Sequence, residues 1–213
     1  STKDQSYFLF ATLKDQLDYV RFPLGNFLKS EIREMAKNYD LEVSDKPDSQ
    51  DICFVTSKTY RDFLNIIKPD LNISGDIVDL NGNILGVHKG IANYTIGQRK
   101  GIGIGGSNLP LYVIDIVKEK NQIVLGEIKF LKKTSISLKN INWLDDSIMI
   151  NNLKCSAKIR STQKESSGIL KINSKKAIFT FDKEISNTSP GQACVFYLKD
   201  QVLGGGWITK PGN

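Results

Sequence analysis

The sequence predicts an α+β protein that is mainly β, and three observations lead to that fold class. Helical periodicity is confined to the first third of the chain. Two hairpin signals follow it, and short alternating segments then recur to the end at a spacing typical of a small antiparallel β-barrel. We therefore expect three parts, at residues 1–68, 69–130 and 131–213.

Two helices are expected in the first part. In "KSEIREMAKNYDL" the apolar residues recur at the i, i+3, i+4, i+7 spacing of one helix face, and Ser30 is the expected N-cap. That apolar set is Ile32, Met35, Ala36 and Tyr39. A second helix is expected in "SKTYRDFLNIIKP", where Pro69 ends the pattern.

Between these helices lies the segment "DKPDSQDICFV", which contains Cys53. Pro47 disfavours helix at Lys46, and the polar residues that follow indicate a loop, so Cys53 lies near a loop edge. The thiol is either an ordinary buried group or a reactive one. Asp48 and Asp51 would raise its pKa if close, whereas Lys46 or a following helix N-terminus would lower it. Local sequence leaves both interpretations open.

Two hairpins are expected in the second part. The first, in "DIVDLNGNILGV", turns at Asn81 and Gly82, which both tolerate positive φ. The second, in "LYVIDIVKEKNQIVLGEI", turns at Lys120 and Asn121.

A glycine-rich loop, "YTIGQRKGIGIGG", joins the two hairpins. It matches neither the Walker phosphate loop nor the dinucleotide fingerprint. Arg99 and Lys100 could contact phosphates from this loop, or the loop could be a solvated turn that lets strands bend.

The third part is expected to form the barrel. Residues 153–160 alternate between an apolar face and a polar, basic face that carries Lys154, Lys158 and Arg160. That basic face is either a phosphate-binding surface or the solvated side of a sheet. Further strands are expected at "GILKIN", "AIFTF", "ACVFYL" and "QVLGGGWI".

Composition narrows the possible functions. The net charge of +6 and the pI of about 9.1 favour a polyanionic partner without identifying it. No run of apolar residues is long enough to cross a bilayer and the first residues do not resemble a signal peptide, so we expect a cytoplasmic protein with no membrane partner.

The cysteines and the histidine argue against a metal centre. The three cysteines are widely spaced, which is typical neither of a disulfide framework nor of a zinc site. Cys155 and Cys194 lie on apolar strand faces and are expected in the core. The single histidine, His88, is expected at a turn or strand end. No metal is therefore expected, and the sequence also contains no ATP-binding loop, no Ser/His/Asp arrangement with a usable histidine and no conspicuous carboxylate pair.

Several long motifs together resemble the tRNA-specific 2-thiouridylase family. They are "KDQSYFL", "FPLG", "DSQDICFV", "GVHKGIANYTIGQRKGIGIGG", "LYVID", and "SPGQACVFY" followed by "LGGGWI". They occur in the family's order and span almost the whole chain. The resemblance implies an enzyme that uses ATP to activate C2 of the wobble uridine of tRNA and replaces its oxygen with sulfur.

The resemblance also implies a role for Cys53, which occupies the position of the family's persulfide cysteine. The family pairs this cysteine, in a disulfide formed as sulfur is delivered, with a second cysteine in an N-terminal ATP-binding domain that carries an S-G-G-x-D-S loop. That loop is not in this sequence, so the chain is similar to the C-terminal portion of the family, and we expect it to bind no ATP and to be inactive alone. The implied partners are tRNA and a sulfur donor or relay protein.

The family's tRNA contacts can be carried over where motifs match. "KDQ" implies that Lys3, Asp4 and Gln5 contact tRNA, and "SPGQA" implies that Gln192 lies near the anticodon region. "KIRS" implies that Arg160 and Ser161 also contact tRNA. The family commonly has an aromatic residue where Ser161 stands, so the resemblance does not carry a stacking contact to that position.

The resemblance assigns an architecture to the three parts. Residues 1–68 would be the helical tail of an α/β catalytic domain interleaved with part of a central domain, residues 69–130 the rest of the small β-rich central domain, and residues 131–213 a C-terminal antiparallel β-barrel. Two other functions stay open: a stand-alone tRNA- or RNA-binding module with a structural cysteine, and a sulfur carrier that binds no RNA.

Overall fold

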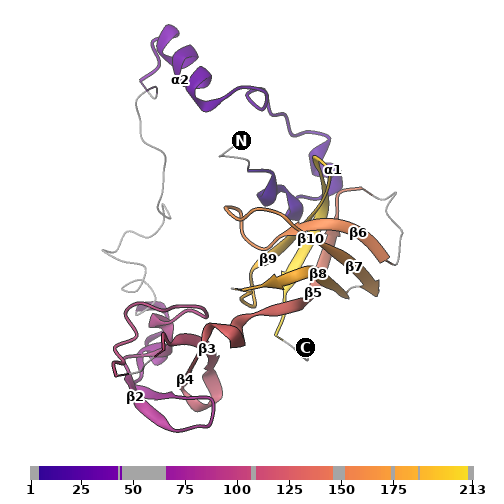
Figure 1. The fold of residues 1–213 in the computed structure, drawn as a ribbon. Coiled ribbons are helices and arrows are strands. Elements are labelled where there is room, and N and C mark those ends of the chain that lie inside the picture. Colours follow the sequence, from indigo (N-terminus) through magenta and orange to yellow (C-terminus); the bar gives the residue numbers. More distant parts are fainter. Residues whose placement is uncertain are drawn as a thin grey trace.

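The structure is a computed structural model that describes residues 5–42, 44, 66–106, 109–145, 152–173, 176–186 and 188–210. Lys3, Asp4 and Cys53 lie outside these residues, as does most of the second expected helix. In Figure 1 the chain runs from N-terminal helices to a small β-sheet and then to a β-barrel. The fold is α+β and mainly β, as the sequence predicts.

The N-terminal part contains one short and one longer α-helix after a 3₁₀ helix. These elements are η1 (Ser6–Ala11), α1 (Lys14–Leu17) and α2 (Lys29–Asn38). Helix α2 confirms the predicted helix, with Ile32, Met35 and Ala36 half-buried, but Tyr39 is its C-cap and is exposed, so it does not share the buried face. The expected N-cap was wrong: Leu28 is the cap instead of Ser30, because the helix begins at Lys29 and the Glu31 carboxylate accepts the Leu28 N–H at 2.5 Å.

The central sheet has the strand order β2-β1-β4-β3. Its elements are η2 (Pro69–Asn72), β1 (Gly75–Val78), β2 (Ile84–His88), η3 (Ile91–Asn93), β3 (Tyr112–Val117), η4 (Lys118–Lys120) and β4 (Gln122–Gly126). β1 and β4 run parallel, and the other two pairs are antiparallel. Both expected hairpins are confirmed, with φ of 86° at Gly82 and 49° at Asn121.

The glycine-rich loop covers the core of this central sheet. Ile102 is buried in the same cluster as Ile77 and Val113, and Ile104 packs against that cluster. Two backbone hydrogen bonds hold the loop on β3, from Gly97 N to Val113 O at 2.8 Å and from Val113 N to Gln98 O at 2.9 Å. The loop therefore has a packing role in the central sheet.

His88 ends strand β2, as expected, and is fully buried. Its Nδ1 accepts the Gly90 N–H at 3.0 Å, so Nε2 carries the proton and donates to the Asn121 carbonyl oxygen at 2.9 Å. The Nε2 bond joins the two hairpins, whereas the Nδ1 bond holds the chain just after β2. Among the described residues no group of three or more His, Cys, Asp or Glu side chains is arranged to hold a metal ion.

The barrel is closed in the order β10-β5-β8-β7-β6-β9, and all its strand pairs are antiparallel. Its strands are β5 (Lys133–Trp143), β6 (Asn152–Lys158), β7 (Ser166–Asn173), β8 (Lys176–Ile185), β9 (Ala193–Leu198) and β10 (Gln201–Ile208), and η5 (Ile128–Leu131) precedes them. The expected barrel and five of these strands are confirmed, whereas β5 has no counterpart in the sequence-based expectations.

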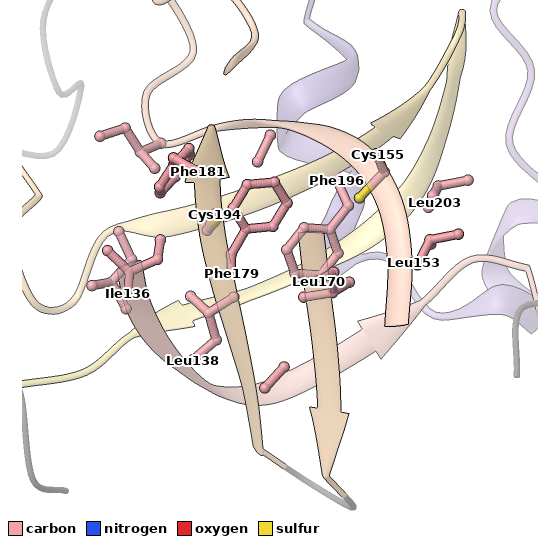
Figure 2. Packing of buried hydrophobic residues seen from close by; sticks show 14 of the residues in the cluster. Ile136, Leu138, Leu153, Cys155, Leu170, Phe179, Phe181, Cys194, Phe196 and Leu203 are labelled. Atoms are coloured by element: carbon pink, nitrogen blue, oxygen red, sulfur yellow. The ribbon is translucent and has the colours of Figure 1, made fainter. Parts of the chain in front are cut away.

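Aromatic and aliphatic side chains fill the barrel interior. Figure 2 shows Phe179 and Phe196 at its centre, with their rings stacked at 6.1 Å between centroids. Cys155 and Cys194 belong to this core, which confirms their expected burial. Burial raises the pKa of the Cys155 thiol to about 12 and raises that of Cys194 as well. Both thiols are therefore protonated at neutral pH.

No helix within the described ranges is long and apolar enough to cross a membrane.

Candidate functional site

The N-terminal residues 5–13, here called the strap, lie against the outside of the barrel (Figure 1). Tyr7 and Phe10 are buried there in a cluster with alternate residues of β9, namely Ala193, Val195 and Tyr197. The intervening residues of β9 point into the barrel core. Both faces of β9 are thus covered, which explains why its sequence is an unbroken apolar run.

Three polar contacts fix the strap in place. The Tyr7 hydroxyl donates to the Ala193 carbonyl oxygen at 2.9 Å. The Asn142 side-chain amide, on β5, donates to the Phe10 carbonyl at 2.7 Å and to the Thr12 carbonyl at 2.9 Å. One side-chain amide therefore replaces two hydrogen bonds that these backbone carbonyls would otherwise make to water.

Packing around Phe10 also requires a glycine on the barrel. A Cβ at Gly205 would lie 2.7 Å from a ring carbon of Phe10 and 2.7 Å from the Cys194 carbonyl oxygen. The Phe10 ring also packs edge-on against Trp207 of β10, with 5.4 Å between ring centroids. The strap thus lies in close contact with strand β10.

Arg160 and Ser161 lie in the turn after β6. Lys158, the last residue of β6, pairs with Val195, so the chain leaves β6 beside the start of β9. The Arg160 carbonyl accepts a hydrogen bond from Gln163 N at 3.2 Å, which closes the turn. Burial, followed by the neighbouring Cys194 and Tyr197, raises the pKa of Tyr7 to about 12, and the nearby Arg160 charge opposes this rise. Val195, which pairs with Lys158, packs in the same cluster as Tyr7, so this turn begins close to the strap.

Gln192 immediately precedes β9, and its backbone is held on both sides. Its N–H donates to the Ser189 carbonyl at 3.2 Å, and its carbonyl accepts from Ile208 N at 2.8 Å. The side-chain Oε1 is buried and accepts no hydrogen bond from the described residues. A buried acceptor without a donor is costly, so this oxygen is an unexplained feature of the segment that precedes β9.

Lys158 is less accessible than the alternating pattern of β6 suggested. Its side chain is only 13% exposed and makes an ion pair of 3.9 Å with Glu165. Its Nζ lies 4.8 Å from the centroid of the Tyr197 ring. The Glu165 carboxylate also accepts the Ser156 hydroxyl. Two lysines of the basic face expected on β6 therefore differ. Lys154 is exposed, whereas the Lys158 side chain lies against the barrel.

The strap lies on the side of the barrel where β9 begins and the turn after β6 is located, so Gln5, Gln192 and Arg160 come from distant segments to one region. Gln5 is exposed two residues before Tyr7, Gln192 adjoins Ala193, and Arg160 lies near Tyr7. Ser161 follows in the same turn. Their tRNA contacts stay a prediction, as do the roles of Lys3, Asp4 and Cys53, which lie outside the described residues.

Two residues that organise this site, Tyr7 and Asn142, were not singled out from the sequence. The unbroken apolar run "ACVFYL" carried a usable signal, because a barrel strand with only one buried face would alternate. Nothing local to Asn142 indicates its two acceptors, which lie 132 and 130 residues away.

Comparison with known proteins finds three consecutive family models along the chain. They are described as a tRNA methyl transferase HUP domain at residues 1–57, a tRNA methyl transferase PRC-barrel domain at 61–127, and an aminomethyltransferase beta-barrel domain at 133–208.

Curated relatives match almost the whole chain. The tRNA-specific 2-thiouridylases MnmA of Rickettsia felis and Rickettsia canadensis are each 49% identical to it over 210 residues, which is 98% of this chain and 57% of each relative. The corresponding protein of Rickettsia conorii is 48% identical over 98% of this chain and 56% of its own length. The chain therefore spans a little more than half the length of these relatives.

Proposed function

Because the chain belongs to the family of tRNA-specific 2-thiouridylases, we propose that it supplies the persulfide cysteine and part of the tRNA-binding surface of such an enzyme. The enzyme would replace the C2 oxygen of the wobble uridine with sulfur. This role implies tRNA and a sulfur donor or relay protein as partners, and a cytoplasmic location.

The observation that supports the tRNA-binding role most directly is the Tyr7 to Ala193 hydrogen bond of 2.9 Å. It ties the strap, which begins at Gln5, to Ala193 of the "SPGQA" segment, and the charge of Arg160 acts on Tyr7. A guanidinium suits phosphate oxygens, and the amides of Gln5 and Gln192 can donate to or accept from base or sugar groups. These contacts support a shared tRNA-binding surface for Gln5, Arg160 and Gln192.

The proposed sulfur carrier is Cys53. Of the three cysteines, Cys155 and Cys194 are buried in the barrel core with raised pKa values, so neither offers a thiolate to a sulfur donor. In this proposal the Cys53 thiolate takes up sulfane sulfur as a persulfide, whose terminal sulfur is a strong nucleophile. A second cysteine outside this chain then forms a disulfide with Cys53 as that sulfur is delivered.

ATP activation belongs to residues outside this chain in the same proposal. The glycine-rich loop at 94–106 does not fit a triphosphate, since it packs Ile102 and Ile104 onto the central core and is followed by strand β3. A phosphate-binding loop of the Walker type opens a helix, whose N-terminal N–H groups hold the phosphates. We therefore expect no ATP binding and no thiouridine formation by the chain alone.

Binding of an unmodified tRNA transcript tests this proposal. Arg160→Ala should weaken binding by about tenfold, as expected for the loss of one charge-assisted phosphate contact. Lys171→Ala, which removes the same charge from an exposed position of the neighbouring strand β7, is the matched control and should change the affinity less. Equal affinities of wild type and Arg160→Ala would contradict the assigned surface.

A further inference from the structure

Two lysines and a tryptophan form a row across three barrel strands. In the strand register Lys176 of β8 lies opposite Lys139 of β5, and Lys139 lies opposite Trp207 of β10. The sequence neighbours Ala177, Leu138 and Ile208 are buried in the barrel core, so the three row residues point outward. All three are exposed, with Trp207 at 39%. We call these residues the Lys-Trp row.

The Lys-Trp row lines a surface hollow of about 740 Å³. Lys210 and Asn140 also line it, and its described lining residues include no Asp or Glu. Lys210 makes an ion pair of 3.6 Å with Asp115, but both side chains are about half exposed, so solvent weakens that pair. The hollow is therefore electropositive.

The pairing of Lys139 with Lys176 is unfavourable without a counter-charge. Like charges directly opposite each other on neighbouring strands destabilise a sheet, and Lys139 and Lys176 are such a pair. The backbone beside Lys139 is also irregular: the register shifts next to Trp207, and Asn140 has φ of 51°. Bulges of this kind redirect side chains and are typical of functional sites. An anionic partner would remove the repulsion.

The hollow is continuous with the proposed tRNA surface. Pro190 and Gly191 line it and directly precede Gln192. Trp207 pairs with Ala193 on β9 and packs against Phe10 of the strap. A polyanion that contacts Gln192 can therefore reach the Lys-Trp row without leaving the barrel surface.

We propose that the Lys-Trp row is a second RNA-binding site, at which Lys139 and Lys176 contact backbone phosphates and Trp207 stacks on an unpaired base. This inference rests on the proposed function and extends its binding surface. RNA is favoured over an acidic protein because the hollow combines paired cations with a partly exposed tryptophan side chain, which suits a phosphate next to a base. The edge contact with Phe10 holds the indole in position.

The salt dependence of binding tests the phosphate contacts. The double variant Lys139→Gln/Lys176→Gln should bind an unmodified tRNA transcript about tenfold more weakly, and the slope of log affinity against log salt should fall by about 1 to 2. Lys118→Gln/Lys120→Gln removes the same charge from η4 of the central sheet and is the matched control. The Lys139 and Lys176 changes relieve a repulsion, so the double variant should unfold at no lower denaturant concentration than wild type.

Fluorescence tests the stacking contact. The chain has two tryptophans, and Trp143→Phe leaves Trp207 as the sole tryptophan emitter. Addition of the tRNA transcript should quench this emission, and a short single-stranded RNA should do so at higher concentration.

The possible outcomes separate this inference from the proposed function. If wild type binds tRNA and Arg160→Ala weakens binding, but the Lys139→Gln/Lys176→Gln variant matches its control and Trp207 is not quenched, the second site is wrong and the proposed function stands. If wild type binds no tRNA, both are wrong. A double variant that loses affinity only for an acidic polypeptide would overturn the assignment to RNA.

Discussion

The Tyr7 hydroxyl and the Ala193 carbonyl oxygen, 186 residues apart in the chain, are joined by a buried hydrogen bond of 2.9 Å. This bond connects the N-terminal strap to the start of β9, directly beside Gln192. Tyr7 also contacts Phe10 and lies near Arg160. The strap therefore determines where Gln5 lies relative to Gln192 and Arg160 on the barrel.

Removal of this hydroxyl should loosen the strap without disturbing its packing. Tyr7→Phe keeps the buried ring but leaves the Ala193 carbonyl without its donor, and we expect a loss of about 1 kcal/mol in the free energy of unfolding. Chemical denaturation of both proteins measures the difference. Tyr19→Phe, at an exposed tyrosine, is the control and should leave the stability unchanged.

The same pair predicts a dependence of stability on alkaline pH. The pKa of Tyr7 is raised from 10.0 to about 12 in the folded protein, so the folded state binds more protons than the unfolded state between these values. The contribution of the neutral Tyr7 hydroxyl to the free energy of unfolding is therefore fully present below pH 10 and is lost as the pH rises towards 12. The advantage of wild type over Tyr7→Phe should shrink over that range, whereas a constant difference would show that Tyr7 does not titrate with folding. Cys155 and Cys194 are present in both proteins and cancel in the comparison.

Gly205 offers a test of the close contact between strap and barrel. In Gly205→Ala the new methyl group would lie 2.7 Å from the Phe10 ring and 2.7 Å from the Cys194 carbonyl oxygen. We expect a destabilisation of about 1 to 3 kcal/mol by overpacking, together with faster proteolysis of the strap. Gly105→Ala is the matched control, since a Cβ there meets nothing within 4 Å. Equal stabilities of the two variants would argue against the described packing.

Thiol reactivity should separate the cysteines. Cys155 and Cys194 are buried and protonated, so an alkylating reagent at neutral pH should modify neither of them in the folded protein and both after unfolding. Peptide mapping by mass spectrometry identifies the labelled sites. Rapid labelling of Cys155 or Cys194 in the folded state would remove the argument that singles out Cys53.

Much of the fold could be predicted because its signals are local. The period of α2, the turn residues Gly82 and Asn121, and the alternation of β6 each depend on a few adjacent residues. Strand β5 was missed because its alternation is interrupted where Asn140 takes a left-handed conformation and the register shifts.

The site was less predictable, since it depends on contacts between distant segments. Motif similarity supplied Gln5, Arg160, Ser161 and Gln192, but it carried no information on what holds them together. The strap contacts of Asn142 appear only once the barrel has closed.

Persulfide mapping tests most directly whether this chain carries sulfur on Cys53 for transfer to tRNA, as we propose. After incubation with a sulfane-sulfur donor, the Cys53 peptide of wild type should gain the mass of one sulfur atom, and Cys53→Ser should gain none while Cys155→Ser behaves as wild type. Sulfur on Cys53 combined with no tRNA affinity would instead support a sulfur carrier. No sulfur on Cys53, with tRNA binding intact and unchanged in Cys53→Ser, would contradict the claim and leave an RNA-binding module.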